Sequence, residues 1–363
     1  MHRRRQRVPP PVTVRPQAKG PRHPTRHKRV LQMVSVAVLG AGAFGTALAL
    51  QCARAGSAVR LWCRDTAAVE AMRSARRNPI CLSEVPLPEA VRPTADLTQA
   101  LAHADVVISA VPAQAQRETF TSIAATHVDV PVVWASKGLE LSSGLLLHEV
   151  AKEVFVRPRA LGAISGPNFA AEIASGLPGA TSVAATDPML AEQVVNAMHG
   201  GFFRPYLCTD LVGLEVGGAL KNIIAIAAGV VDGMAFGANA RAALITRGLT
   251  EMARFGVALG ADPATFMGLS GVGDLMLTAT DDQSRNRRFG LALGAGSDVQ
   301  AALKSVGDTV EGVATAQAVM TRAAALGVEL PIIEQVCRLV RAETTAEVAA
   351  RELMARELSR END

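Results

Sequence analysis

The sequence predicts an α/β protein in which a largely parallel, doubly wound sheet over residues 33–210 precedes an all-helical domain over residues 211–363. Three observations predict it. Short β-branched runs alternate with helix-like segments, a glycine motif separates the first strand from the first helix, and strand-like runs stop near residue 210. Alternation together with the glycine motif is typical of a Rossmann-type dinucleotide-binding domain.

Residues 1–32 differ from the rest of the chain. They hold ten of the 37 Lys and Arg residues, six prolines and no acid, so we expect a disordered basic extension. We interpret it as sequence upstream of a start at Met33, and the alternatives are a transit-like segment or a tail that touches nucleic acid.

The chain from Met33 onward carries 27 basic and 33 acidic residues, a net charge of −6, which does not favour nucleic-acid binding. Its five scattered cysteines lack C-x-x-C spacing, so we expect a reducing cytoplasm and no metal. The longest uncharged apolar stretch, Ile223–Val231, has nine residues, about half of a membrane span. We therefore expect no membrane span. The motifs described below predict a small-molecule partner, and the sequence leaves a homodimer open.

Seven apolar runs predict the strands. Met33–Leu39, a helix over Thr46–Ala55 and a strand over Ala58–Cys63 form one βαβ unit. The later strand-like runs are Val106–Val111, Val130–Ala135, Ala160–Ile164, Ala180–Ala184 and Phe202–Cys208.

Ala/Leu-rich segments dominate from Leu211 onward. They predict helices over Leu214–Val231, Ala240–Leu259, Pro263–Gly268, Asn286–Leu293, Gly312–Leu326 and Pro331–Arg341.

Gly40, Gly42 and Gly45 fit the pattern G-x-G-x-x-G between the first strand and the first helix. The first glycine permits the tight turn, the second lets a pyrophosphate approach the backbone, and the third lets the helix pack on the sheet. Helix N-terminal amides then point at the phosphates. This pattern predicts NADP or NAD as cofactor, and a glycine-rich turn without a ligand is the alternative.

Cofactor choice is set at the end of the second strand, where an acid selects NAD and an arginine accepts the 2′-phosphate of NADP. Arg64 directly follows the strand run and Asp65 comes next. We place Arg64 on the 2′-phosphate and favour NADPH. The alternative is that Arg64 is an ordinary exposed charge.

Two loops follow further strand runs, at the carboxyl edge where such sheets bind ligands. In one, Lys137 can hold an anionic substrate or phosphate, and in the other Gly166 permits close backbone approach beside Asn168. Plain surface turns are the alternative for each.

Lys221 is the only cation between Arg204 and Arg241, on a helix of small and aliphatic residues. A buried lysine is costly unless it is paired or used, and desolvation lowers its pKa towards the range where the ammonium donates a proton. Gly217 and Gly218, one turn earlier, are predicted to leave space for a ligand. A lysine that reaches water with its head group is the alternative.

Asp281–Arg288 places three arginines in four positions beside Ser284 and Asn286, where a helix begins. Guanidinium groups match phosphate oxygens, so this cluster predicts a phosphate site, with a solvated charge cluster as the alternative. The sequence shows no nucleophile set and no histidine spacing for a metal.

Several linked motifs resemble the bacterial NAD(P)-dependent glycerol-3-phosphate dehydrogenase family. The resemblance runs from about Val34 to about Leu339, in GAGAFGTALA, WASKGLE, ISGPNFAAE, GGALKNIIAIAAG, FGANARAALITRGLTEM, GADPATFMGLSGVGDLMLT and QSRNRRFG. It implies a Rossmann domain, a helical domain, and the reversible reduction of dihydroxyacetone phosphate to sn-glycerol 3-phosphate, the head-group precursor of phospholipids.

The resemblance also implies a role for each matched residue. Lys221 would donate and accept the proton, with Asn222 and Asp274 beside it. The substrate would be held by Lys137, Gly166, Asn168, Lys221, Asp274, Ser284, Arg285 and Asn286, with Arg285 on its phosphate. Besides the three motif glycines, the cofactor would be lined by Ala43, Phe44, Arg64, Lys137, Ala170, Arg285, Val310 and Glu311.

Two positions depart from the family pattern: Ala43 stands where a hydroxylated residue is frequent, and Asn168 where Ser or Thr is common. Two other classes stay open. A hydroxyacid dehydrogenase with another anionic substrate would not need the arginine cluster, and a non-catalytic dinucleotide sensor would not need Lys221 with Asp274.

Overall fold

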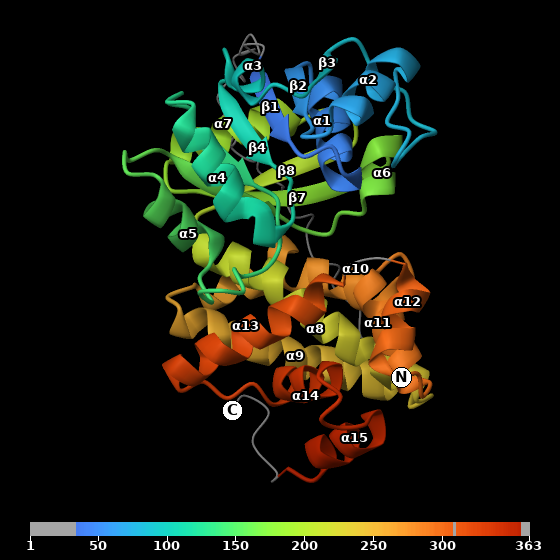
Figure 1. Cartoon of the computed structure of the whole chain (residues 1–363). Coiled ribbons are helices and arrows are strands. Elements are labelled where there is room, and N and C mark those ends of the chain that lie inside the picture. The colour runs from blue at the N-terminus through green and yellow to red at the C-terminus, as the bar shows by residue number, and fades with distance from the viewer. Residues whose placement is uncertain (1–33, 308–309, 357–363) are drawn as a thin grey trace, which may run out of the picture. The chain divides into compact units, whose positions relative to one another are not determined.

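A computed structural model of the chain describes residues 34–307 and 310–356. The prediction for residues 1–32 lies outside this range. The first part of the described chain is an eight-stranded sheet, with strand order β3-β2-β1-β4-β5-β6-β7-β8 (Figure 1). The strands are β1 (Ser35–Leu39), β2 (Ala58–Trp62), β3 (Val91–Thr94), β4 (Val106–Ser109), β5 (Val132–Trp134), β6 (Leu161–Ser165), β7 (Gly179–Ala185) and β8 (Phe203–Cys208).

The sheet is parallel from β3 through β6, which confirms the predicted fold class. Strand β7 pairs antiparallel with β6 and parallel with β8, so the last two strands run opposite to the others. All seven predicted runs form strands. The eighth, β3, was not predicted because it has only four residues and Arg92 and Pro93 leave it without an apolar run, and as an edge strand it tolerates the proline.

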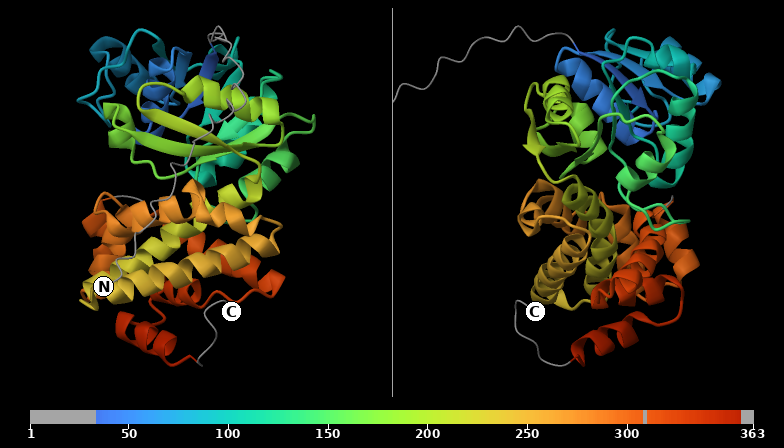
Figure 2. Two further views of the ribbon diagram at one scale, coloured as in Figure 1. Left: turned by 180° about the vertical axis from the view of Figure 1, so that it is seen from behind. Right: turned by 90° about the vertical axis from the view of Figure 1, so that its left-hand side faces the viewer.

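Helices cover both faces of the sheet, as the right view of Figure 2 shows. One apolar core lies under α1 (Ala43–Arg54), α2 (Thr66–Ala75), α6 (Ala170–Ser175) and α7 (Pro188–Met198). The other lies under α3 (Leu97–Leu101), α4 (Gln116–Ala125) and α5 (Leu147–Val154). Two-sided burial explains why the inner strands are almost wholly apolar.

The chain after β8 is helical. Its α-helices are α8 (Leu211–Gly233), α9 (Gly237–Ala258), α10 (Asp274–Thr280), α11 (Arg285–Gly294), α12 (Val299–Val306), α13 (Glu311–Leu326), α14 (Pro331–Val340) and α15 (Ala346–Met354). The predicted helix at Pro263–Gly268 is a short 3-10 turn, Pro263–Met267. Helices α10, α12 and α15, which have seven to nine residues, were not predicted.

Helix α8 is the core of the helical part. It is the one helix of the described residues long and apolar enough to cross a membrane, and 94% of its most apolar window is buried inside the protein. Glycines let its neighbour α11 approach to backbone contact: a β-carbon added at Gly290 would lie 2.0 Å from the carbonyl oxygen of Ile226. Helix α8 also contacts β6 and β7, and the described residues form one compact unit. A domain boundary at residue 210 stays a prediction.

Glu251 of α9 anchors the first turn of α14 and gives a testable pH dependence. Its carboxylate accepts hydrogen bonds from the backbone amides of Ile332 (2.7 Å) and Ile333 (3.2 Å). Burial raises the pKa of Glu251 from 4.5 to about 7. A raised carboxyl pKa contributes stability below pH 4.5 that is lost as the pH rises through about 7.

We therefore expect the free energy of unfolding of the parent to fall over this pH range relative to Glu251→Gln, which cannot titrate. Urea unfolding at several pH values measures the difference. The exposed Glu118 supplies the control variant Glu118→Gln, which should follow the parent. Parallel curves for the parent and Glu251→Gln would contradict the expectation.

Candidate active site

The turn between β1 and α1 has the geometry that a dinucleotide pyrophosphate requires. Gly40 has φ +107°, and a β-carbon at Gly45 would lie 1.9 Å from the carbonyl oxygen of Gly40. Around Gly42 there is open space, and as the N-cap of α1 it has no side-chain cap for the first helical amides. Ala43 is exposed beside it. A phosphate fits where a β-carbon would otherwise stand.

The end of β2 separates the two candidate cofactor-selecting side chains. Asp65 is the N-cap of α2, and its Oδ1 accepts hydrogen bonds from the amides of Ala67 (2.9 Å) and Ala68 (3.2 Å). Arg64 is exposed, and no hydrogen bond or ion pair of its side chain to another described residue is seen. The Asp65 carboxylate is thus occupied in capping α2, whereas the Arg64 guanidinium is exposed at the position where a 2′-phosphate would lie.

Lys221, Asp274 and Lys137 meet in one buried cluster. Lys221 Nζ donates to Asp274 Oδ1 and, at 2.9 Å, to the hydroxyl of Thr278. Lys137 Nζ donates to the other carboxylate oxygen of Asp274 at 2.6 Å and to the carbonyl of Gly166 at 3.3 Å. Asp274 is 0% exposed and Lys221 7%. Three separate elements, α8, α10 and the loop after β5, thus place their charges together.

This cluster holds two ammonium groups against one carboxylate, so its net charge is positive and suits an anion. Burial lowers the pKa of Lys221 from 10.5 to about 8, opposed by the charge of Asp274 and reinforced by that of Lys137. A lysine with this pKa can lose and regain a proton near neutral pH.

Lys137 joins the cluster to the glycine turn. Its ammonium lies 5.9 Å from the ring centroid of Phe44, the second residue of α1. The Lys221–Asp274–Lys137 cluster and the predicted cofactor turn therefore lie next to each other.

The two glycines before Lys221 have a different use from the predicted one. A β-carbon at Gly217 would lie 2.3 Å from the carbonyl oxygen of Ser270, and one at Gly218 would lie 2.9 Å from Ser165 Oγ. The prediction of ligand space at these glycines is wrong, because Ser270 and Ser165 fill it. The glycines instead let the end of β6 and the turn Leu269–Gly273 approach α8.

Asn222 belongs to a second polar network. Its amide nitrogen donates to Glu311 Oε2 (3.1 Å) and its amide oxygen accepts from Asn286 Nδ2 (3.0 Å). Asn286 Oδ1 in turn accepts from the amide of Gly312 at 2.9 Å. The network ties α8, α11 and α13 together. It links Asn222, predicted beside the proton donor, and Asn286, predicted for substrate, to Glu311, which was predicted for cofactor.

At the start of α11 the predicted phosphate residues divide into two groups. Ser284 caps the helix by accepting from the amide of Arg287 at 3.2 Å, and Arg287 is buried in ion pairs with Asp232 (2.7 Å) and Asp282. Arg285 and Arg288 are exposed. Arg287 is therefore structural, and Arg285 stands at the helix N-terminus where a phosphate would bind.

The remaining predicted residues lie at element starts. Ala170 is the first residue of α6, and Val310, which is buried, is the N-cap of α13. Asn168 follows β6, and its amide oxygen is buried without a hydrogen-bond partner among the described residues. This oxygen is available to a hydroxyl of a bound ligand.

Two polar residues near the site, Thr278 and Glu215, were not predicted from the sequence. Thr278 lies one turn after Asp274 on α10, so the i, i+4 spacing was the available signal. Glu215 accepts from Trp134 Nε1 (3.1 Å) and lies 2.5 Å from His148 Nδ1, which ties α8 to β5 and α5. No spacing in the sequence indicates these contacts of Glu215. The described residues contain no group of side chains suited to a metal.

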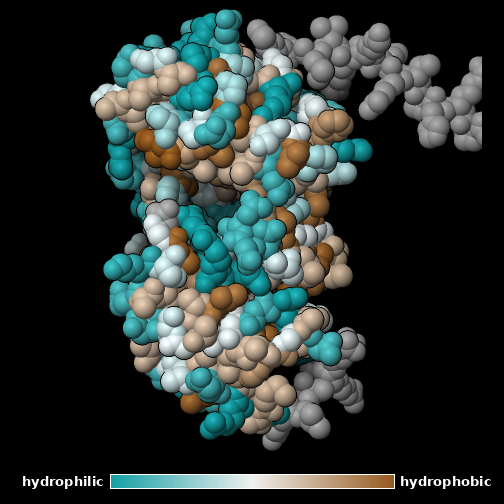
Figure 3. Space-filling view, turned by 90° about the vertical axis from the view of Figure 1, so that its right-hand side faces the viewer, coloured by the Kyte–Doolittle hydropathy of each residue, from teal (hydrophilic) through white to brown (hydrophobic). Residues whose placement is uncertain are grey.

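On the face shown in Figure 3 the surface is hollowed, and hydrophilic side chains gather beside the hollow.

A glycine-turn dinucleotide sheet combined with a buried lysine and carboxylate defines a nicotinamide-dependent dehydrogenase. Two family descriptions match the chain: the NAD-dependent glycerol-3-phosphate dehydrogenase N-terminus over residues 35–191 and C-terminus over residues 210–351. The chain belongs to this family.

Individual relatives agree. The chain is 51% identical to the glycerol-3-phosphate dehydrogenase [NAD(P)+] of Halorhodospira halophila over 322 residues, 89% of this chain and 97% of that one. A Thioalkalivibrio sulfidiphilus protein of the same name is also 51% identical, over 89% and 97% of the two chains. The crystal structure of the Coxiella burnetii enzyme is 40% identical, with a TM-score of 0.85 over 89% of this chain and 99% of that one.

Proposed function

We propose that the chain catalyses the reversible NAD(P)H-dependent reduction of dihydroxyacetone phosphate to sn-glycerol 3-phosphate, with Lys221 as the proton donor. The observation that carries this assignment is the buried contact of Lys221 with Asp274, next to Lys137 and the glycine turn. Family membership supports the substrate. The product is the head-group precursor of glycerophospholipids, so the reaction supplies phospholipid synthesis.

When bound, the reduced nicotinamide supplies a hydride to the ketone carbon. Negative charge then builds on the ketone oxygen, and Lys221 neutralises it by donating a proton, which gives the secondary alcohol. The charge of Asp274 keeps Lys221 protonated near neutral pH. The Thr278 hydroxyl accepts a second hydrogen bond from the ammonium and orients it. In the reverse direction neutral Lys221 accepts the alcohol proton.

The substrate phosphate is assigned to Arg285 at the N-terminus of α11. The exposed guanidinium and the helix amides both favour a dianion there, and the Ser284 hydroxyl keeps a proton to donate. Lys137, Asn168 and the Gly166 backbone are assigned to the hydroxyl end of the substrate. Binding at a phosphate remote from the reacting carbon orients the ketone for hydride transfer.

An assay of NADPH oxidation with three substrates tests the function. We expect turnover with dihydroxyacetone phosphate, and far lower kcat/KM with dihydroxyacetone, which lacks the phosphate. A preference for a 2-keto acid would instead identify the related hydroxyacid dehydrogenase class. Cofactor binding without turnover of any of the three would identify a dinucleotide sensor.

Arg64→Ala tests the proposed preference for NADPH. The variant should raise KM for NADPH about tenfold or more and leave KM for NADH nearly unchanged, because only NADPH carries the 2′-phosphate that Arg64 would bind. The exposed Arg351 of α15 supplies the matched control Arg351→Ala. Equal increases in KM for both cofactors would exclude this role for Arg64.

We also propose a cytoplasmic setting, which the five free cysteines support. A homodimer stays a prediction, and light scattering of the purified chain measures the oligomeric state directly.

A further inference from the structure

A cavity of about 180 Å³ lies on the sheet at the edge opposite the active site. The residues that line it come from the amino ends of β1 and β2, from the segment that enters β3, and from the end of α3. Active-site loops follow the carboxyl ends of the strands, as Arg64 follows β2. The cavity is therefore separate from the cofactor and substrate residues described above.

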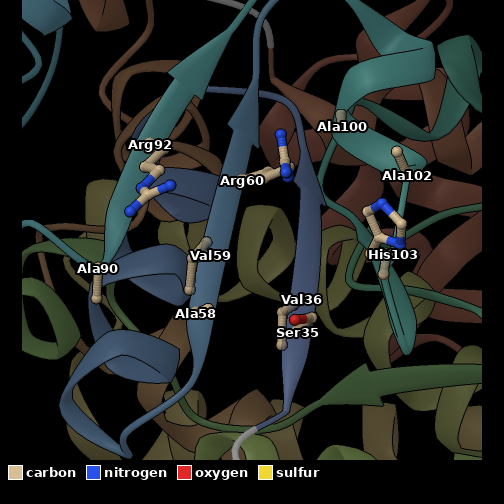
Figure 4. Close-up of a pocket in the computed structure, with 11 residues that line it drawn as sticks. Ser35, Val36, Ala58, Val59, Arg60, Ala90, Arg92, Ala100, Ala102 and His103 are labelled. Carbon is tan, nitrogen blue, oxygen red and sulfur yellow. The ribbon is translucent and has the colours of Figure 1, made fainter.

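Two arginines dominate this cavity. Arg60 of β2 and Arg92 of β3 are register partners in a parallel pair, so their side chains extend from the same face of the sheet. Figure 4 shows both guanidinium groups on that face, with His103 beyond β1. Small side chains leave the space beside them open: the lining includes Ala58, Ala90, Ala100, Ala102 and Ala104.

The described residues provide no counter-ion for this arginine pair. No hydrogen bond or ion pair joins the side chain of Arg60 or Arg92 to another described residue. The acidic residues within four positions of Arg92 or of the α3 end of the lining are Glu89, Asp96 and Asp105. The Asp96 carboxylate accepts a hydrogen bond from the amide of Gln99 at 3.0 Å, and the Asp105 carboxylate accepts one from the amide of Ser35 at 2.8 Å. Like charges directly across a strand pair are destabilising, so an anion between them would lower the free energy.

We infer that this cavity is a binding site for a small phosphate-type dianion held between Arg60 and Arg92. Two unit positive charges match a dianion, and guanidinium groups pair with phosphate oxygens in a two-pronged geometry. The volume is below the roughly 300 Å³ of the smallest usual ligand pockets, which favours a phosphate or a small phosphate monoester over a nucleotide. His103 adds a further nitrogen at the rim.

Thermal unfolding of the full chain tests the site. The parent, Arg60→Gln/Arg92→Gln and the control Arg351→Gln are compared in sodium chloride and in inorganic phosphate at equal ionic strength. Phosphate should raise the Tm of the parent and the control by about 2–5 °C over chloride, and the Tm of the double variant by less than half as much. In chloride, the double variant should be at least as stable as the parent, because the repulsion is gone.

Phosphate that binds at Arg285 contributes equally to all three proteins, so the difference between them reports the new site. Equal increments in the parent and the double variant, both with inorganic phosphate and in the glycerol 3-phosphate arm described next, would overturn the inference. The kcat for dihydroxyacetone phosphate should stay within about twofold in every variant, and the single variants Arg60→Gln and Arg92→Gln serve if the double variant does not fold.

A second arm replaces inorganic phosphate by glycerol 3-phosphate. A larger rise in Tm for the parent than for the double variant supports the site. If it occurs with inorganic phosphate alone, the ligand is the free ion; if it occurs with glycerol 3-phosphate alone, the ligand is the monoester; if it occurs with both, the site accepts either. No parent-specific increment in either arm overturns it.

Discussion

Replacing Lys221 by methionine should lower kcat for dihydroxyacetone phosphate about 10²–10⁴-fold, the usual contribution of a positioned general acid. Cofactor binding should persist, because Lys221 lies on α8 and the cofactor turn lies between β1 and α1. The fold should persist as well. Methionine has a similar length, and Asp274 keeps its ion pair with Lys137.

Steady-state kinetics and a fluorescence titration with NADPH separate the two effects. Lys304→Met on the exposed side of α12 is the matched control and should leave kcat unchanged. If Lys221→Met turns over substrate within a few-fold of the parent, Lys221 is structural and the mechanism is wrong. If the variant also loses NADPH, the position assigned to α8 relative to the nicotinamide is wrong.

Replacing Asp274 by asparagine should lower the pKa of Lys221 below its present value of about 8. Burial lowers this pKa, and the negative charge of Asp274 is the interaction that raises it. An opposite charge at this range shifts a pKa by about 1–3 units. The reduction rate falls as pH rises through the pKa of the donor, so the alkaline fall of kcat should move to lower pH. At neutral pH we expect a loss of about tenfold or more.

The pH dependence of kcat in the parent, Asp274→Asn and Thr278→Val measures this shift. Thr278→Val removes the other hydrogen-bond partner of Lys221 without a change of charge, so its alkaline limb should stay close to that of the parent. An unmoved limb in Asp274→Asn would show that the group titrating in catalysis is not Lys221.

Most of the fold follows from local patterns. Six of the seven predicted strands lie inside the sheet, where burial on both faces gives short apolar runs. The edge strand β8 still has four apolar residues around Arg204 and Pro205, whereas the edge strand β3 has only four residues in all, and Arg92 and Pro93 are two of them. The reversed direction of β7 and β8 depends on how the chain crosses between strands, which apolar runs do not record. Helix α10 was hidden because it follows a glycine-rich turn and has only seven residues.

Individual site residues could be predicted where their position on one strand or helix was informative by itself. The strand-end positions of Lys137 and Gly166, and the isolation of Lys221 on an apolar helix, point to the same edge of the sheet. The partners are non-local: Asn222 contacts Glu311, 89 residues away, and Lys137 contacts Asp274, 137 residues away. Gly217 was misinterpreted for the same reason, since the loop that needs its missing side chain lies in a distant part of the sequence.

Chemical rescue of Lys221→Ala tests most directly whether an ammonium proton at this position drives the reduction. Ethylammonium and tetramethylammonium carry the same charge, but only ethylammonium has a proton to donate. We predict that ethylammonium restores turnover of dihydroxyacetone phosphate in a saturable manner and that tetramethylammonium does not. Equal stimulation by both ions would contradict the account, because positive charge alone would then suffice.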